Sequence, residues 1–104
     1  LLKGISMKVD KDKLNLIIEH FRRLHQVVKL GEEVGELNKA ILNFENGYTR
    51  TNNEITEEIA DVYLLLEQVK LMYGLDKNEI RTVMQMKTDR TIDKYNIEGG
   101  NFVG

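Results

Sequence analysis

The sequence predicts an all-α fold of four helices in one domain. The chain of 104 residues contains no proline, the residue that most strongly interrupts helices. Apolar residues recur at intervals of three and four in four segments, and short polar stretches separate these segments. This length suits a single domain, which we place at residues 1–104, with residues 1–12 and 96–104 as loosely ordered tails. We therefore expect a four-helix bundle.

The first predicted helix has its apolar pattern between Leu14 and Phe21. Its apolar residues have helical spacing and are Leu14, Ile17, Ile18 and Phe21. Either Asp10 or Asp12 can cap the start, because a carboxylate accepts hydrogen bonds from the free N–H groups of a first turn. A polar stretch at residues 22–25 follows, and the sequence leaves open whether it forms a turn or a kink.

The second predicted helix covers about residues 26–45. Its apolar residues at helical spacing are Val27, Leu30, Val34, Leu37, Ile41 and Phe44. The pair Asn46-Gly47 ends it. Gly31 and Gly35 lie inside it, where each costs up to about 1 kcal/mol relative to alanine. Close approach of a neighbouring helix or a ligand would explain Gly35, whereas Gly31 fits a helix start equally well.

The third predicted helix follows the loop NGYTRTNN, which ends in an N-cap at Asn52 or Asn53. Its apolar residues are Ile55, Ile59, Val62, Leu65, Leu66, Val69 and Met72. Gly74 suits the left-handed position that commonly terminates a helix.

The fourth predicted helix opens with Asp76 and Glu79, which have the spacing of a capping box. It continues to about Tyr95 through Ile80, Val83, Met84, Lys87 and Arg90. The glycine-rich tail NIEGGNFVG follows.

Composition and charge argue against several classes of protein. The chain has no cysteine, which excludes disulfides and thiolate metal sites and fits a reducing compartment, so we expect a cytoplasmic protein. The N-terminus lacks the features of a signal peptide. The longest apolar run, residues 62–66, is much shorter than the roughly 20 residues of a membrane span. A net charge of -2 argues against a nucleic-acid polymer as partner, because binding to its phosphates normally needs a basic excess.

Two pairs of carboxylates stand out in the second and third predicted helices. Glu33 and Glu36 form one pair, and Glu58 and Asp61 form the other. Spacing of three residues puts both carboxylates of a pair on one helix face, about one turn apart. Each pair continues the apolar stripe of its helix. Four carboxylates facing a helical core would repel one another and lose hydration, at a cost of several kcal/mol for each uncompensated charge.

A divalent cation would compensate this charge. Carboxylate ligands, with no cysteine and two histidines in the chain, favour Mg²⁺ over zinc, with Mn²⁺ as a substitute. The Glu-x-x-His pattern of helical di-iron sites is absent, and the run at Asp10 and Asp12 lacks the ligand and glycine positions of an EF-hand. The alternative is a solvated acidic face, which is the common role of a single helical glutamate and fits four carboxylates on two apolar stripes less well.

The two acidic segments resemble the MazG-like nucleoside triphosphate pyrophosphohydrolases of the all-α NTP pyrophosphatase superfamily. EEVGEL at residues 32–37 looks like the family's E-E-x-x-E motif, and EEIADV at residues 57–62 looks like its E-x-x-D motif. The resemblance extends through GLD at residues 74–76 to the segment KTDRTIDKY, and so covers about residues 26–95. It implies a four-helix bundle of the all-α NTP pyrophosphatase type.

The resemblance also implies roles for the matched acidic residues. Glu33, Glu36, Glu58 and Asp61 would be the ligands of Mg²⁺. Glu32 and Glu33 would be the catalytic residues, with Glu32 beside the metal, where it would orient or deprotonate water.

The fourth predicted helix would supply the substrate contacts. Lys87 falls where the family places a phosphate-binding lysine, and Lys94 with Tyr95 also agrees with the family pattern. Thr91 departs from it, because the family often has asparagine at this position. The resemblance therefore implies substrate binding by Lys87, Arg90, Lys94 and Tyr95, and a solvated basic face is the alternative for the three cations.

The implied reaction is hydrolysis of a nucleoside triphosphate to nucleoside monophosphate and pyrophosphate by attack of a metal-activated water on the α-phosphate. The substrate would be a deoxynucleotide or a non-standard nucleotide. One alternative is a phosphoribosyl-ATP hydrolase or a dUTP- or dCTP-specific hydrolase of the same superfamily. Another, from a different class, is a non-catalytic helical interaction module.

We also expect a homodimer or homotetramer that associates through its helices. The third predicted helix has apolar residues on more than one face, including Tyr63, Leu64 and Leu71. A small domain buries a modest fraction of its surface, so a second subunit would supply the missing cover. The family resemblance points to the same assemblies.

Overall fold

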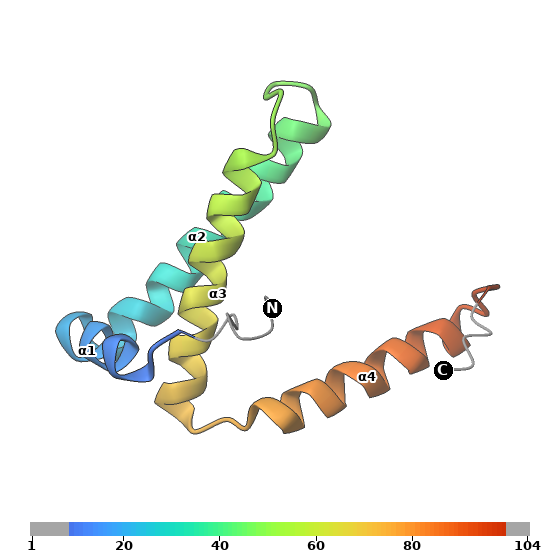
Figure 1. The fold of residues 1–104 in the computed structure, drawn as a ribbon. Helices are drawn as coiled ribbons and strands as arrows, with labels where there is room; N and C mark the ends of the chain where they lie inside the picture. The colour runs from blue at the N-terminus through green and yellow to red at the C-terminus, as the bar shows by residue number, and fades with distance from the viewer. Residues whose placement is uncertain (1–8, 100–104) are drawn as a thin grey trace, which may run out of the picture. The chain divides into compact units, whose positions relative to one another are not determined.

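The computed structural model describes residues 9–99, which form four α-helices without any strand. The helices are α1 (Lys11–Phe21), α2 (Arg23–Glu45), α3 (Asn53–Tyr73) and α4 (Lys77–Lys94), and Figure 1 shows them in chain order. This confirms the predicted all-α class. Within this range, no helix is both long and apolar enough to cross a membrane. The outer parts of the two predicted tails, residues 1–8 and 100–104, lie outside the described residues.

The backbone divides into two compact units, one ending at Gly74 and the other beginning at Leu75. The first unit contains α1, α2 and α3. Helices α2 and α3 run in opposite directions and pack along each other, and α1 contacts both (Figure 1). The second unit contains α4, none of whose residues is buried. The packed core of the described residues therefore lies among the first three helices.

Helices α1 and α2 are separate, because the chain turns at a single residue between them. Arg22 has φ 74° and ψ 159°, a backbone conformation that residues other than glycine rarely adopt. Its N–H donates to the carbonyl of Ile18, and its own carbonyl accepts from the N–H of Gln26. Asp10 caps α1, with the N–H of Asp12 donating to its side chain at 2.8 Å. Helix α1 thus begins at Lys11, directly after Asp10, one of the two predicted caps.

As the sequence predicts, α3 ends at Gly74 and α4 begins after its N-cap Asp76. Gly74 ends α3 in the left-handed conformation, with φ 62° and ψ 38°. Asp76 caps α4 and accepts from the N–H of Asn78 at 2.8 Å. Helix α3 starts at Asn53 as expected, but the side chain of Asn52 makes no capping hydrogen bond.

The core is small for a chain of this length. Its buried apolar residues are Leu14, Ala40, Val62, Leu65 and Met72. Two polar residues, Gln26 and Gln68, are buried with them. Many large apolar side chains are exposed instead, among them Leu24 and Val28 on α2 and Tyr63 on α3. The three helices therefore leave apolar surface that no other described part of the first unit covers.

Gly31 and Gly35 both lie inside α2, so the helix start considered for Gly31 is wrong. A Cβ atom at either position would meet nothing within 4 Å. Close approach within the described chain therefore does not explain either glycine.

Candidate metal centre

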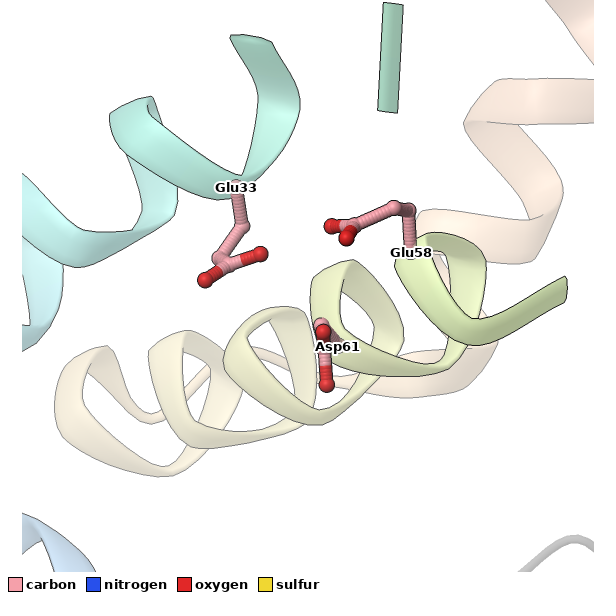
Figure 2. Close-up of side chains that lie close together, drawn as sticks. All are labelled: Glu33, Glu58 and Asp61. Atoms are coloured by element: carbon pink, nitrogen blue, oxygen red, sulfur yellow. The ribbon is translucent and has the colours of Figure 1, made fainter. Parts of the chain in front are cut away.

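Three of the predicted acidic residues converge between α2 and α3. Glu33 comes from α2, and Glu58 and Asp61 come from α3, and one carboxylate oxygen of each lies within 4.8 Å of the other two. In Figure 2 the side chains of Glu33 and Glu58 extend toward each other across the space between the two helices. The cluster forms because Glu58 and Asp61 are one helical turn apart and α2 runs alongside in the opposite direction.

The cluster is buried on one side and open on the other. The side chain of Glu33 is 15% exposed, Glu58 is half-buried, and Asp61 is exposed. Oxygen Oε2 of Glu58 is buried and has no hydrogen-bond partner in the described part of the chain. A buried carboxylate oxygen without a partner loses hydration without compensation. This oxygen is the feature that distinguishes the cluster from an ordinary acidic surface.

Proximity to the other carboxylates changes the acidity of Glu58. A hydrogen bond that a protonated Glu58 can make with Glu33 raises the pKa of Glu58 above its usual value of 4.5, and partial burial and the charges of Glu33, Asp61 and Glu36 raise it further. Two ionised carboxylates cannot donate to each other, so the hydrogen bond requires a proton on one of them. The cluster therefore favours an added positive charge, which either a proton or a metal ion can supply.

Lys29 lies beside the cluster, and the sequence reasoning did not identify it. Its Nζ is 3.4 Å from Oε1 of Glu33 and 3.6 Å from Oε2 of Glu32. A hydrogen bond with Glu33, together with the negative charges of Glu33 and Glu32, raises the pKa of the ammonium group. Lys29 precedes Glu32 by three residues and Glu33 by four, and this spacing along a helix is the sequence pattern that indicates such ion pairs. One ammonium offsets only part of the charge of Glu33, Glu58 and Asp61.

The remaining predicted acidic residues lie outside the cluster. Glu36 is exposed and is not among the converging carboxylates, although its charge contributes to the raised pKa of Glu58. A step of three residues rotates a side chain by about 60° around an α-helix, which carries Glu36 from the packed face of α2 toward solvent. The side chain of Glu32 is also exposed and pairs with Lys29. The structure thus brings together three of the four predicted ligands.

The donor set fits a hard divalent cation. All three converging residues offer carboxylate oxygens, the ligands that Mg²⁺ and Mn²⁺ prefer. The buried oxygen of Glu58 lacks a positive partner, which a cation would provide. Glu33, Glu58 and Asp61 would hold such an ion, with Glu36 close enough to affect the local charge.

The predicted substrate-binding residues all belong to the second unit. Lys87, Arg90 and Lys94 lie on α4, and Tyr95 follows its last turn. All four are exposed, and the ammonium of Lys94 lies 5.4 Å from the centre of the Tyr95 ring. Their part in substrate binding stays a prediction.

Comparison of this chain with known protein families, with curated proteins and with solved structures found no match. The resemblance described above therefore rests on the two acidic segments and the residues around them.

Proposed function

We propose that the chain is a Mg²⁺-dependent nucleoside triphosphate pyrophosphohydrolase that releases nucleoside monophosphate and pyrophosphate. The observation that carries this proposal is the convergence of Glu33, Glu58 and Asp61, with one buried oxygen of Glu58 left without a partner. The motifs EEVGEL and EEIADV, which supply these residues, support it independently of the geometry.

The chain's own residues have distinct roles in this proposal. Glu33, Glu58 and Asp61 would hold the cation, and the exposed position of Asp61 leaves the cluster accessible to a substrate. A bound Mg²⁺ supplies charge neutralisation at phosphate oxygens and lowers the pKa of water. Lys29 would keep Glu32 and Glu33 in place through its two ion pairs. Glu32 is exposed beside the cluster, where it would orient water or accept a proton.

Substrate recognition is proposed for the residues of α4. Lys87, Arg90 and Lys94 carry the positive charge that a triphosphate requires, and Tyr95 adds an aromatic ring. In a homodimer or homotetramer these residues would bind the phosphates of a substrate held by a neighbouring chain. The favoured substrates are deoxynucleotides or non-standard nucleotides, and the alternatives to test are a hydrolase of phosphoribosyl-ATP and a hydrolase specific for dUTP or dCTP.

Product analysis tests the proposed reaction. A panel of ribo- and deoxynucleoside triphosphates and phosphoribosyl-ATP would be incubated with and without Mg²⁺, and pyrophosphate and orthophosphate would be measured separately. We expect pyrophosphate release that requires Mg²⁺ or Mn²⁺ and is lost in Asp61→Asn. Glu19→Gln, an exposed change on α1, is the matched control and should keep full activity. Orthophosphate as the first product, or turnover without any divalent ion, would contradict the proposal.

A helical interaction module is the second candidate, because large apolar side chains are exposed on α2 and α3. Leu24, Val28 and Leu42 on α2 and Tyr63 on α3 are examples. Surfaces of this kind commonly bind other proteins. This alternative predicts neither metal binding nor pyrophosphate release, so the same panel separates the two functions.

A further inference from the structure

A buried chain of hydrogen bonds links α2 to α3 at a distance from the acidic cluster. Gln26 and Gln68 are 5% and 3% exposed, and Nε2 of Gln26 donates to Oε1 of Gln68 at 2.8 Å. Nε2 of Gln68 in turn donates to the carbonyl of Leu64 at 3.3 Å. At the other end, Nδ1 of His25 lies 2.7 Å from Oε1 of Gln26. Because an amide oxygen can only accept, the imidazole is the donor there.

Thermodynamic stability alone does not explain two buried amides in a small core. Replacing both partners of a buried polar pair by apolar residues of similar size is often neutral or stabilising. Such pairs can instead select one alignment of two helices, because a shifted alignment would leave buried donors and acceptors unpaired. The buried apolar residues of α3, such as Val62 and Leu65, contribute less to this selection, since apolar packing is not directional.

The alignment that pairs the glutamines also assembles the acidic cluster. Glu33 lies seven residues after Gln26, and Asp61 lies seven residues before Gln68, which is two helical turns on each helix. Since α2 and α3 are antiparallel, the two pairs occupy the same faces of the same helices. Sliding one helix by a single turn would displace its carboxylates by about 5.4 Å. That displacement is larger than the 4.8 Å within which the carboxylate oxygens now converge.

We infer that Gln26 and Gln68 are positioning residues, which fix the alignment of α2 with α3 and thereby hold Glu33 opposite Glu58 and Asp61. The inference rests on the proposed function to the extent that the assembled cluster binds a metal ion. Its geometric part, the fixed alignment of the two helices, is independent of that function.

The first test replaces both glutamines with leucine and measures stability and metal binding separately. We expect Gln26→Leu with Gln68→Leu to keep or raise the metal-free melting temperature. Its affinity for Mn²⁺, followed by the electron paramagnetic resonance signal of the free ion, should fall by about 10-fold or more, the usual effect of removing groups that orient metal ligands. Leu65→Ala is the matched control at the same interface, because it should lower the melting temperature while the folded protein keeps its Mn²⁺ affinity.

The second test measures the alignment without any metal. The chain contains no cysteine, so Lys39→Cys with Thr56→Cys can be labelled selectively with nitroxides at two exposed positions, one on each helix. We expect one narrow distance distribution with the glutamines present and a broadened or shifted distribution after both are replaced by leucine. The same double change to methionine provides a second version with a different side-chain shape.

The outcomes separate this inference from the proposed function. If the unaltered chain does not bind Mn²⁺, the proposed function fails, and the label distances still decide whether the glutamines set the alignment. An unchanged distance distribution in the glutamine-free chains would overturn the inference. Loss of folding in both the leucine and the methionine versions would overturn it as well, since the pair would then act on stability.

Discussion

At Glu58, one carboxylate oxygen is buried without a partner while the neighbouring Asp61 is open to solvent. A proton on Glu58 would allow it to donate to Glu33, so the fold favours the protonated form of Glu58 and raises its pKa. Lys29 compensates part of the charge from one side only. The charge of this cluster therefore depends on pH.

Glu58→Gln should stabilise the metal-free protein and remove its response to metal. A glutamine amide can donate to Glu33, as the protonated carboxyl does, without adding negative charge. For the unaltered chain, a metal ion at a hundred times its Kd should add about 2.7 kcal/mol to the free energy of unfolding, and this increment should vanish in the variant. Thermal unfolding in EDTA and in excess Mg²⁺ or Mn²⁺ measures both effects, with Glu19→Gln as the exposed control. Metal-independent melting of the unaltered chain would rule out the site.

Stability in metal-free buffer should rise as the pH falls below neutrality. The raised pKa of Glu58 means that the folded chain binds this proton more tightly than the unfolded chain does. The resulting stabilisation is fully present below the usual pKa of 4.5 and is lost as the pH rises through the higher value of the folded state. Melting temperatures of the unaltered chain and of Glu58→Gln would be compared between about pH 7 and pH 5. We expect the advantage of the variant to shrink toward acid pH, and a constant difference would contradict the assignment.

At the scale of helices, the break between α1 and α2 is built on a strained residue. Arg22 has a positive φ combined with an extended ψ, which side chains other than glycine rarely tolerate. Immediately after it, the guanidinium of Arg23 lies 5.6 Å from the centre of the Tyr73 ring, so the start of α2 contacts the end of α3. Packing of the helices on each other thus imposes a conformation that the local sequence does not favour.

Arg22→Gly should stabilise the protein by about 1 kcal/mol, because glycine adopts this conformation without the steric cost of a Cβ atom. The gain is smaller than the full strain, since glycine also increases the entropy of the unfolded chain. Chemical denaturation of the variant and of Arg22→Ala measures the effect. Alanine removes the same side-chain charge but keeps the Cβ atom, so it should give no comparable gain. Equal stabilisation by both substitutions would show that charge, rather than backbone strain, is responsible.

For the whole molecule, the main physical feature is the small core. The core of the described chain contains five buried apolar residues, whereas large apolar side chains such as Leu24 and Tyr63 are exposed. The free face of α2 also contains Gly31 and Gly35, beside which a neighbouring helix could pack closely. A small domain with so little buried apolar surface gains stability from association.

We therefore predict that the chain forms a homodimer or homotetramer. Light scattering or sedimentation at micromolar concentration should give a mass of at least twice 12.1 kDa. Gly35→Leu would place a bulky side chain on α2 at a position where an added Cβ atom meets nothing within 4 Å in the described chain, and it should weaken an assembly that uses this face. Asn15→Leu, on the exposed surface of α1, is the control for added bulk. A clean, active monomer would contradict the predicted assembly.

Local interactions allowed the sequence by itself to determine four helices and most of their boundaries. Asp10 and Asp76 cap helices through hydrogen bonds to residues two positions away, and Gly74 takes the left-handed turn that its missing Cβ permits. The same short range explains why the pairs Glu33 with Glu36 and Glu58 with Asp61 could be recognised from spacing alone.

Contacts between distant segments were decided only by the tertiary structure. Glu33 lies close to Glu58, whereas Glu36 is exposed to solvent. This difference depends on how α2 and α3 are rotated and aligned, and no local sequence pattern determines that. The buried hydrogen bond between Gln26 and Gln68 joins residues 42 positions apart, and the local sequence around neither residue predicts it. Sequence spacing places side chains on a helix face, and the packing of one helix on another selects which of those side chains meet.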